Sequence, residues 1–416
     1  MPTLPRRKVA VAVGALAVVL GAGTLAGYGL LAGWFDEGDV RGTTEGFVPT
    51  QIDPGDADAG AWPEYGRTPE RTRANGDLRL GPPYRRLWSM DAGSLLEFPP
   101  VVAGGTAFVA TNRGKAFAVR IANGEVRWRR NLHGVVASSP ATARAGGRAI
   151  VLFSTMAGDV IALDPDTGGV RWRVRLRSPI ESSPLVLGGR AFVGTKDRRV
   201  VAIDVTRRRV AWTTRVDGDV KGSLARLGGN VVVGDYSGRV TALRASDGRR
   251  VWRTTSPGGA LRGAGRFYAG PAVAYGRVFI GNVNGRVLAL SGSTGRVSWV
   301  HQVDDYVYAS AAVTDRTVYV GSYDHRLYAL NAVTGDVRWS ADAGERLSGS
   351  PTVIGDLVWV STLARTPRDG RTIAYDVRTG ARVFTFPDGR YATPVGVKDR
   401  LIVTGVRTLY GLAPRR

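Results

Sequence analysis

The stretch Ala162-Leu-Asp-Pro-Asp-Thr-Gly-Gly-Val-Arg-Trp172 recurs along the chain, with the same ten-residue step from its alanine to an aromatic residue. A lone Trp88 precedes the first copy. Such self-similarity indicates a repeat architecture, in which each copy is one supersecondary unit that packs against its neighbours. The seven copies are Ala118 to Trp128, Ala162 to Trp172, Ala202 to Trp212, Ala242 to Trp252, Ala289 to Trp299, Ala329 to Trp339 and Ala374 to Phe384.

The period of the repeat is typical of a β-propeller blade. Successive aromatic residues from Trp88 onward are 40, 44, 40, 40, 47, 40 and 45 residues apart. Within the copy that ends at Trp252, short β-branched runs at 224–227, 231–233 and 240–243 precede a fourth run that begins at 251, and glycine turns separate them. This pattern predicts four short strands in each unit, and no run between the glycines is long enough for a helix.

The end of the repeat predicts how the ring closes. Residues 393–412 supply three strands, but the aromatic residue that should follow Gly411 by ten positions would fall beyond Arg416. We therefore expect the missing outer strand to come from 85–90, which contains Trp88. The fold class is then all-β, an eight-bladed propeller of four-stranded antiparallel blades in which the N- and C-terminal strands share one blade, with no exposed edge left by an open array.

The repeat also resembles a known family. The pattern Ala-x-Asp-x-x-Thr-Gly-x-x-x-Trp, complete in Ala162 to Trp172, resembles the quinoprotein-type (PQQ-like) β-propeller repeat. The architecture is similar to that of the propeller lipoprotein of the outer-membrane β-barrel assembly machinery. Two departures are Arg207-Arg208 in place of Thr-Gly, and Phe384 in place of tryptophan. The resemblance implies that the repeated aromatic residues dock between adjacent blades, namely Trp88, Trp128, Trp172, Trp212, Trp252, Trp299, Trp339 and Phe384.

The N-terminal region predicts a membrane anchor. Residues 1–8 form a basic cytoplasmic tail, and 9–33 are an apolar run that, as a helix of about 37 Å, is long enough for a bilayer core of about 30 Å. Arg6, Arg7 and Lys8 place the tail in the cytoplasm, so we expect a single-pass signal anchor in the cell membrane with the propeller on the extracytoplasmic side. A cleaved signal peptide is the alternative, although its apolar core usually spans about 7–15 residues. We further expect an acidic flexible linker over 34–60, a pre-propeller segment over 61–83 that packs against the ring, and the propeller over 84–416.

Composition limits the chemistry. The chain has no cysteine, which excludes disulfides, thiolate metal sites, cysteine nucleophiles and lipid attachment through cysteine. The net charge is +22, and arginine makes up most of the Lys and Arg total of 57, which suggests a GC-rich genome as much as selection. Attraction to the membrane surface or to an anionic envelope polymer follows from this charge, whereas nucleic acid lies in the wrong compartment. We expect a monomer.

Loops that connect each aromatic position to the next inner strand are the expected binding surface, because they gather on one face of the ring. Ordinary solvated loops are the alternative, since no spacing repeats a catalytic or metal signature, and the three histidines are too dispersed for zinc. Small residues before prolines, such as Ser183-Pro184, meet a steric need at the axis or line a polar tunnel. The candidate binding residues are Glu97, His133, Glu181, Asp219, Arg262, Asp304, Asp305, Tyr306, Arg346 and Arg390.

These features favour a non-catalytic scaffold that binds a protein or an envelope polymer, with no cofactor, metal or catalytic residue. One alternative is a quinone-dependent dehydrogenase, for which the resemblance implies a Ca²⁺-bound pyrroloquinoline quinone (PQQ), a catalytic aspartate, a vicinal disulfide and long insertions. The absence of cysteine and the near-minimal blades argue against that enzyme. A small-ligand sensor is the other alternative.

Overall fold

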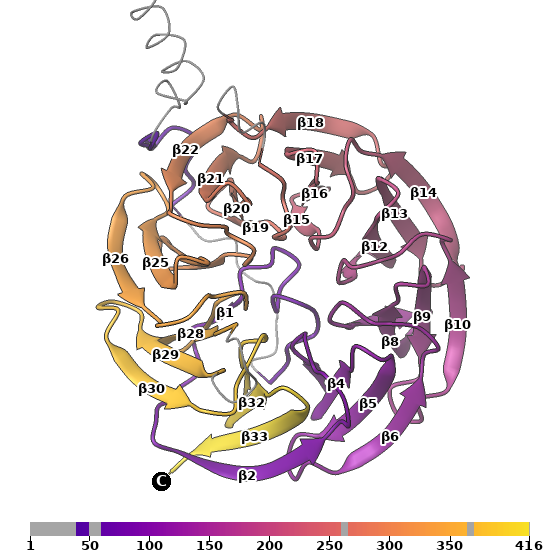
Figure 1. Cartoon of the computed structure of the whole chain (residues 1–416). Helices are drawn as coiled ribbons and strands as arrows, with labels where there is room; N and C mark the ends of the chain where they lie inside the picture. Colours follow the sequence, from indigo (N-terminus) through magenta and orange to yellow (C-terminus); the bar gives the residue numbers. More distant parts are fainter. Residues whose placement is uncertain (1–38, 50–59, 259–264, 364–369, 416) are drawn as a thin grey trace, which may run out of the picture.

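The computed structural model is a ring of eight four-stranded antiparallel blades around a central axis (Figure 1). It describes residues 39–49, 60–258, 265–363 and 370–415. Within these ranges all regular structure is β, and no helix is long and apolar enough to cross a membrane. The expected anchor at 9–33 and the tail at 1–8 lie outside the described residues.

Each blade contributes one strand to each of four concentric positions. The strands nearest the axis are β3 (Val101–Ala103), β7 (Ala141–Ala145), β11 (Leu185–Leu187), β15 (Ala225–Leu227), β19 (Ala272–Ala274), β23 (Ala312–Thr314), β27 (Thr352–Ile354) and β31 (Val395–Val397). The second strands are β4 (Thr106–Ala110), β8 (Arg148–Ser154), β12 (Arg190–Thr195), β16 (Asn230–Gly234), β20 (Arg277–Gly281), β24 (Thr317–Gly321), β28 (Leu357–Ser361) and β32 (Arg400–Thr404).

The third strands are β5 (Lys115–Arg120), β9 (Asp159–Leu163), β13 (Arg199–Asp204), β17 (Arg239–Arg244), β21 (Arg286–Ser291), β25 (Arg326–Asn331), β29 (Thr372–Asp376) and β33 (Thr408–Pro414). The outer strands are β6 (Val126–Asn131), β10 (Val170–Arg175), β14 (Arg209–Arg215), β18 (Arg250–Thr255), β22 (Val297–Gln302), β26 (Val337–Asp342), β30 (Arg382–Phe386) and β2 (Tyr84–Asp91). We number the blades 1 to 8 from β3. A short β1 (Ala74–Asn75) pairs parallel with β27 at the inner edge of blade 7.

Blade 8 confirms the predicted closure. Its order is β2-β33-β32-β31, so the first long strand of the chain pairs with the last, and Trp88 lies opposite Gly411. The strands expected in blade 4 agree with the observed ones to within one residue at each end. The eight-bladed, all-β prediction is therefore confirmed.

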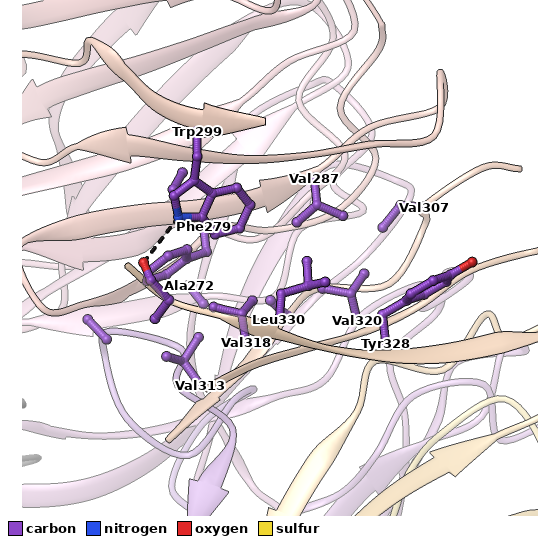
Figure 2. Packing of buried hydrophobic residues seen from close by; sticks show 14 of the residues in the cluster. Ala272, Phe279, Val287, Trp299, Val307, Val313, Val318, Val320, Tyr328 and Leu330 are labelled. Carbon is purple, nitrogen blue, oxygen red and sulfur yellow. Dashed lines mark hydrogen bonds between the residues drawn. The ribbon is translucent and has the colours of Figure 1, made fainter. Parts of the chain in front are cut away.

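The hydrophobic core is divided among the interfaces between neighbouring blades. Figure 2 shows the interface of blades 5 and 6, where Trp299 and Phe279 of blade 5 pack with Val318 and Leu330 of blade 6. All four side chains are buried. At about 25 cal/mol per Å² of buried apolar surface, each such interface stabilises the ring separately, which is how a chain of this size exceeds the usual single-core limit.

The repeated tryptophans contact the turn of the next blade in a regular geometry. A Cβ placed on Gly335 would lie 3.0 Å from the indole of Trp299, so glycine lets the ring approach the turn closely. The Trp299 indole N–H also donates to the Ala332 carbonyl at 3.1 Å, three residues before that glycine. The same donation occurs from Trp88 to Ile121, Trp128 to Pro165, Trp212 to Ala245, Trp252 to Gly292 and Trp339 to Val377.

The two departures from the repeat change this geometry. Arg208 occupies the turn position of glycine in blade 3 and keeps the left-handed conformation, with φ of 60°. Trp172, the tryptophan that faces this turn, is buried and its indole nitrogen has no hydrogen-bond partner among the described residues. Phe384 meets a different partner, because Tyr84 of the shared blade packs edge-on against it with ring centroids 4.9 Å apart.

Residues 39–49, which the sequence places in the linker, run along blades 5 and 6 from the outer strand β22 to the turn between β19 and β20. Val40 forms an antiparallel bridge with Val300 of β22, and Arg41 pairs with Asp336 at 2.9 Å. Phe47 stacks on Tyr275 with ring centroids 5.2 Å apart. This part of the expected flexible linker is therefore attached to blades 5 and 6.

Candidate functional site: a blind cavity on the ring axis

The pre-propeller segment, residues 62–75, lies in the central channel and follows the inner strands around the axis (Figure 1). It forms a hydrogen bond with the inner strand of every blade in chain order. The partners are Val102, Thr142, Val186, Arg226, Val273, Val313, Val353 and Gly396. We call this segment the plug, because it joins the eight blades at the axis.

Two buried arginines fasten the plug to opposite parts of the ring. Arg71 donates to the carbonyls of Pro184 and Leu224, in blades 3 and 4, at 3.0 and 2.9 Å. Arg73 donates to the Pro351 carbonyl in blade 7 at 2.8 Å. Both arginines have left-handed backbones, with φ of 63° and 56°, which costs about 1–2 kcal/mol each for a residue with a Cβ. Their side-chain bonds to these carbonyls offset that cost.

A buried ion pair accompanies Arg71. Glu64 lies 3.1 Å from the Arg71 guanidinium and accepts a hydrogen bond from the Val186 amide. Burial raises the pKa of Glu64 to about 7, although Arg71 and the amide lower it. The plug therefore carries an acid whose protonation changes near neutral pH.

A cavity of about 400 Å³ lies at the axis, and the plug closes it with Tyr65 and Arg73. A volume of this size is in the range of small-molecule sites. Arg73 lies over the Tyr65 ring at 4.4 Å from its centroid, and the Tyr65 hydroxyl is 2.9 Å from the Ser350 hydroxyl. The cavity is consequently blind at this end rather than an open tunnel.

One position of the repeat lines the cavity in all eight blades. It is the residue four positions before the first residue of each inner strand, and mostly small residues or proline separate it from that strand. Because the blades converge on the axis, side chains at this equivalent position meet around a single space. They are Glu97, Ala137, Glu181, Lys221, Tyr268, Tyr308, Ser348 and Tyr391 in blades 1 to 8.

Aromatic rings from blades 4, 5, 6 and 8 form one wall. Tyr268 and Tyr308 meet edge-on with centroids 5.1 Å apart, and Tyr308 lies 4.9 Å from Tyr323. Tyr236 and Tyr323 come from a second shared position, the turn after the second strand. Burial, with a smaller contribution from Glu181, raises the pKa of Tyr236 to about 12. These phenols are neutral at physiological pH and present both ring faces and hydroxyl groups.

Charged groups form the opposite wall. Burial raises the pKa of Glu97, and the nearby Glu181 adds to this effect. Glu181 pairs with Lys196 at 3.3 Å. The Lys221 ammonium lies 4.3 Å from the centroid of the Tyr236 ring and therefore already occupies an aromatic face. The cavity thus combines acceptors, donors and aromatic surface.

A belt of hydroxyls underlies these walls. The Ser183 hydroxyl accepts from the Ser139 amide at 3.0 Å, and the Ser223 hydroxyl accepts from the Ser183 amide at 3.1 Å. Ser310 and Ser350 repeat the arrangement in blades 6 and 7. Small residues at the axis therefore join neighbouring blades, and Ser183, Ser223, Ser310 and Ser350 also line the cavity.

Comparison with known proteins adds the family. The sequence profile of the family described as outer membrane protein assembly factor BamB matches residues 79–146, 142–304 and 293–413. The chain belongs to this family. No curated protein sequence matches the chain.

Several solved structures have the same fold as this chain. BamB from Moraxella catarrhalis is 19% identical with a TM-score of 0.67, over 80% of this chain and 100% of that one. Quinohemoprotein alcohol dehydrogenase from Comamonas testosteroni is 15% identical with a TM-score of 0.70, over 88% of this chain and 83% of that one. The computationally designed Ika8 protein is 15% identical with a TM-score of 0.65, over 79% and 99% of the two chains. Likeness to an assembly factor, an enzyme and a designed protein shows fold alone.

The cavity does not fit a calcium-bound quinone. Among the described residues, no three His, Cys, Asp or Glu side chains converge as a metal-ligand group. The cavity carboxylates are Glu97 and Glu181, which would face the carboxylates of PQQ, while Lys221 is already placed over tyrosine rings and Arg73 is bonded to backbone carbonyls. These residues supply neither the ligands nor the charge that this cofactor needs.

The structure brings only some of the candidate binding residues to this site. Glu97 and Glu181 line the cavity. Arg346, Arg390 and Tyr306 lie behind it, against the rings of Tyr323, Tyr391 and Tyr308. The others are peripheral: His133 lies near Asp159, Asp219 is 3.9 Å from Arg198, Asp304 donates its amide to Asp324, and Asp305 accepts from the Tyr306 amide. Arg262 lies outside the described residues.

Sequence reasoning predicted that the pre-propeller segment packs against the ring, but it missed the position of that segment in the central channel and most of the aromatic wall. Tyr236, Tyr268, Tyr308, Tyr323 and Tyr391 were findable, because they occupy two equivalent positions of the repeat. Aligning the repeats by register and reading each column would have selected them. Tyr65 and Arg73 had no such signal, since they precede the repeat.

Proposed function

We propose that this protein is a non-catalytic, membrane-anchored extracytoplasmic scaffold that binds an envelope polymer, and that the axial cavity takes a neutral saccharide unit of that polymer. The observation that carries the proposal is the division of the cavity wall. Tyr268, Tyr308 and Tyr391 supply aromatic faces on one side, and Glu97, Glu181 and Lys221 supply acceptors and a donor on the other.

A neutral polyhydroxylated ligand uses all of these groups. The C–H face of a sugar ring packs on an aromatic face, and its hydroxyls donate to carboxylates and accept from ammonium or phenol groups. An anionic ligand would meet Glu97 and Glu181. A cationic ligand would compete with Lys221, which lies 4.3 Å from the Tyr236 centroid and 5.7 Å from that of Tyr268.

The membrane-anchored part of the proposal comes from residues 9–33 and the preceding basic residues. It is tested in cells. We expect the full chain to resist extraction by alkaline carbonate, and an external protease to digest the propeller in cells whose outer layers have been removed. Release of the full-length chain by carbonate would contradict the anchor.

Binding is tested with detergent-solubilised full chain in a thermal-shift titration with neutral di- and trisaccharides of hexose and N-acetylhexosamine. Saturating ligand at 100 times Kd stabilises the folded state by about 2.7 kcal/mol, so a saturable rise in melting temperature is expected. PQQ with Ca²⁺ is a separate arm. A rise in melting temperature in the PQQ and Ca²⁺ arm only, with none for the saccharides, would favour a quinoprotein dehydrogenase over a scaffold.

A matched pair of variants locates the site. Tyr308→Ala removes a ring from the cavity wall, whereas Val383→Ala removes a side chain that is 43% exposed on the outer strand β30. We expect Tyr308→Ala to weaken saccharide binding about tenfold or more and Val383→Ala to leave it unchanged. Unchanged binding by Tyr308→Ala would place the saccharide elsewhere.

A further inference from the structure

Arginine is distributed unevenly around the rim of the ring. The outer strands of blades 1–4, β6, β10, β14 and β18, contain ten arginines and no aspartate or glutamate. The outer strands of blades 5–8, β22, β26, β30 and β2, contain four arginines and two aspartates. A compositional bias of the genome acts on all of these equivalent strands alike, so it does not by itself account for the asymmetry.

Half of the ten arginines have no carboxylate partner among the described residues. Arg127, Arg171, Arg173, Arg175 and Arg253 pair with aspartates of neighbouring turns or strands. The remaining five are exposed, and at least one lies on blade 1, blade 3 and blade 4. They are Arg129, Arg130, Arg209, Arg215 and Arg250.

The shape of this surface selects the kind of anion. The strands β6, β10, β14 and β18 follow one another along the convex circumference of the ring (Figure 1). A flat bilayer touches a convex rim at a tangent and so reaches one or two blades at a time. A flexible chain bends around the circumference and contacts all four blades together, which releases more counterions.

We propose that the outer strands of blades 1–4 form a docking surface for a flexible linear polyanion with repeating phosphate groups. This surface is separate from the axial cavity, because none of the ten arginines lines that cavity. The proposal therefore stands whether or not the cavity takes a saccharide.

The probe is long-chain inorganic polyphosphate, titrated against the detergent-solubilised full chain at several salt concentrations. If about five arginines contact phosphates, the logarithm of the binding constant falls with the logarithm of salt concentration with a slope of roughly −3 to −4. No binding at low salt would overturn the proposal.

Two triple variants with the same change of charge test the position. Arg129, Arg209 and Arg250→Gln remove three exposed charges from blades 1, 3 and 4, and Arg85, Arg86 and Arg338→Gln remove three exposed charges from blades 8 and 6. We expect the first triple to weaken polyphosphate binding at least about tenfold and to reduce the slope by roughly 2, with a change of less than about threefold for the second.

Two outcomes would overturn the proposal. Equal weakening by the two triples would show that only the total charge matters. Binding to vesicles of anionic phospholipid that is lost in the first triple, with polyphosphate binding intact, would make the membrane the partner of this rim. Thermal unfolding of both triples, which we expect to match the parent, distinguishes a lost contact from a damaged fold.

Discussion

Blades 1–4 and blades 5–8 have the same backbone architecture but different chemistry. At the cavity the first half supplies Glu97, Glu181 and Lys221 with one tyrosine, Tyr236, and the second supplies four tyrosines, Tyr268, Tyr308, Tyr323 and Tyr391. On the rim the first half is strongly basic and the second is nearly balanced. The residues that pack between blades are nearly the same in both halves. The two halves therefore differ in side chains that do not pack between blades. Function is expected at those positions.

The plug joins the two halves. Arg71 bonds to carbonyls of blades 3 and 4, and Arg73 bonds to carbonyls of blade 7. The eight blades are similar to one another, so their repeated positions alone do not distinguish one side of the cavity from the other. A non-repeated segment with different partners in each half supplies that asymmetry.

Alanine substitutions of Trp299 and Trp172 compare the stability that one blade interface contributes in each half. Trp299→Ala removes a fully buried ring and the hydrogen bond to Ala332, and we expect a loss of roughly 4–6 kcal/mol. Trp172→Ala removes a ring without a hydrogen-bond partner, and about 3 kcal/mol is expected. Urea denaturation followed by circular dichroism measures both, with the two Trp→Phe variants as controls. Equal losses would mean that the turn at Arg208 does not weaken its interface.

Methionine substitutions of Arg71 and Arg73 compare how much each of these two side chains stabilises the plug in the ring. Above a pH of about 7, where Glu64 is ionised, Arg71→Met leaves its buried charge without a partner, and a loss of about 3–5 kcal/mol is expected. Arg73→Met leaves backbone carbonyls unpaired without an orphaned charge, so a loss of about 1–3 kcal/mol is expected. The same denaturation assay applies. A larger loss for Arg73→Met would locate the main fastening in blade 7.

Glu64 should make the fastening to blades 2 and 3 dependent on pH. Its pKa is raised by burial from 4.5 to about 7, so the carboxyl is neutral when folded and ionised when unfolded between these values. Its contribution to stability is fully present below pH 4.5 and is lost as pH rises through about 7. Stability of Glu64→Gln relative to the parent should therefore increase over this range, by about 3 kcal/mol. A difference that stays flat would show that Arg71 keeps Glu64 ionised in the folded ring.

Arg208→Gly is the smallest expected effect. It restores the residue of the equivalent turns at a position with φ of 60°, where glycine avoids a cost of about 1–2 kcal/mol. Glycine also loses more freedom on folding, so we expect a net gain of about 1 kcal/mol or less. Gly168→Ala, whose Cβ would lie 2.7 Å from the Trp128 ring, is the matched control and should destabilise. A loss of stability in Arg208→Gly would show that the arginine side chain supports the turn.

Most of the fold was predictable from the repeat. The alanine-to-aromatic step located seven blades, and the last repeat, which lacks its own aromatic residue after Gly411, predicted the shared eighth with the lone Trp88. Two cavity residues, Glu97 and Glu181, were also predicted from their loops. His133 and Asp304 were not brought to the axis, because a loop on one face still places its residues at different distances from the centre.

The sequence by itself determined the blade count, the strand order and the aromatic contacts between blades. Strand order depends on neighbouring segments of one copy, and the aromatic contacts join segments about 40 residues apart. Both recur along the chain, so the pattern is visible in one dimension. Only the tertiary structure decided that residues 62–75 fill the channel and that one column of the repeat meets at a cavity. The physical reason is that both depend on closing the ring. Until the blades surround the axis, neither the unpaired carbonyls that Arg71 and Arg73 satisfy nor the space between the eight side chains exists.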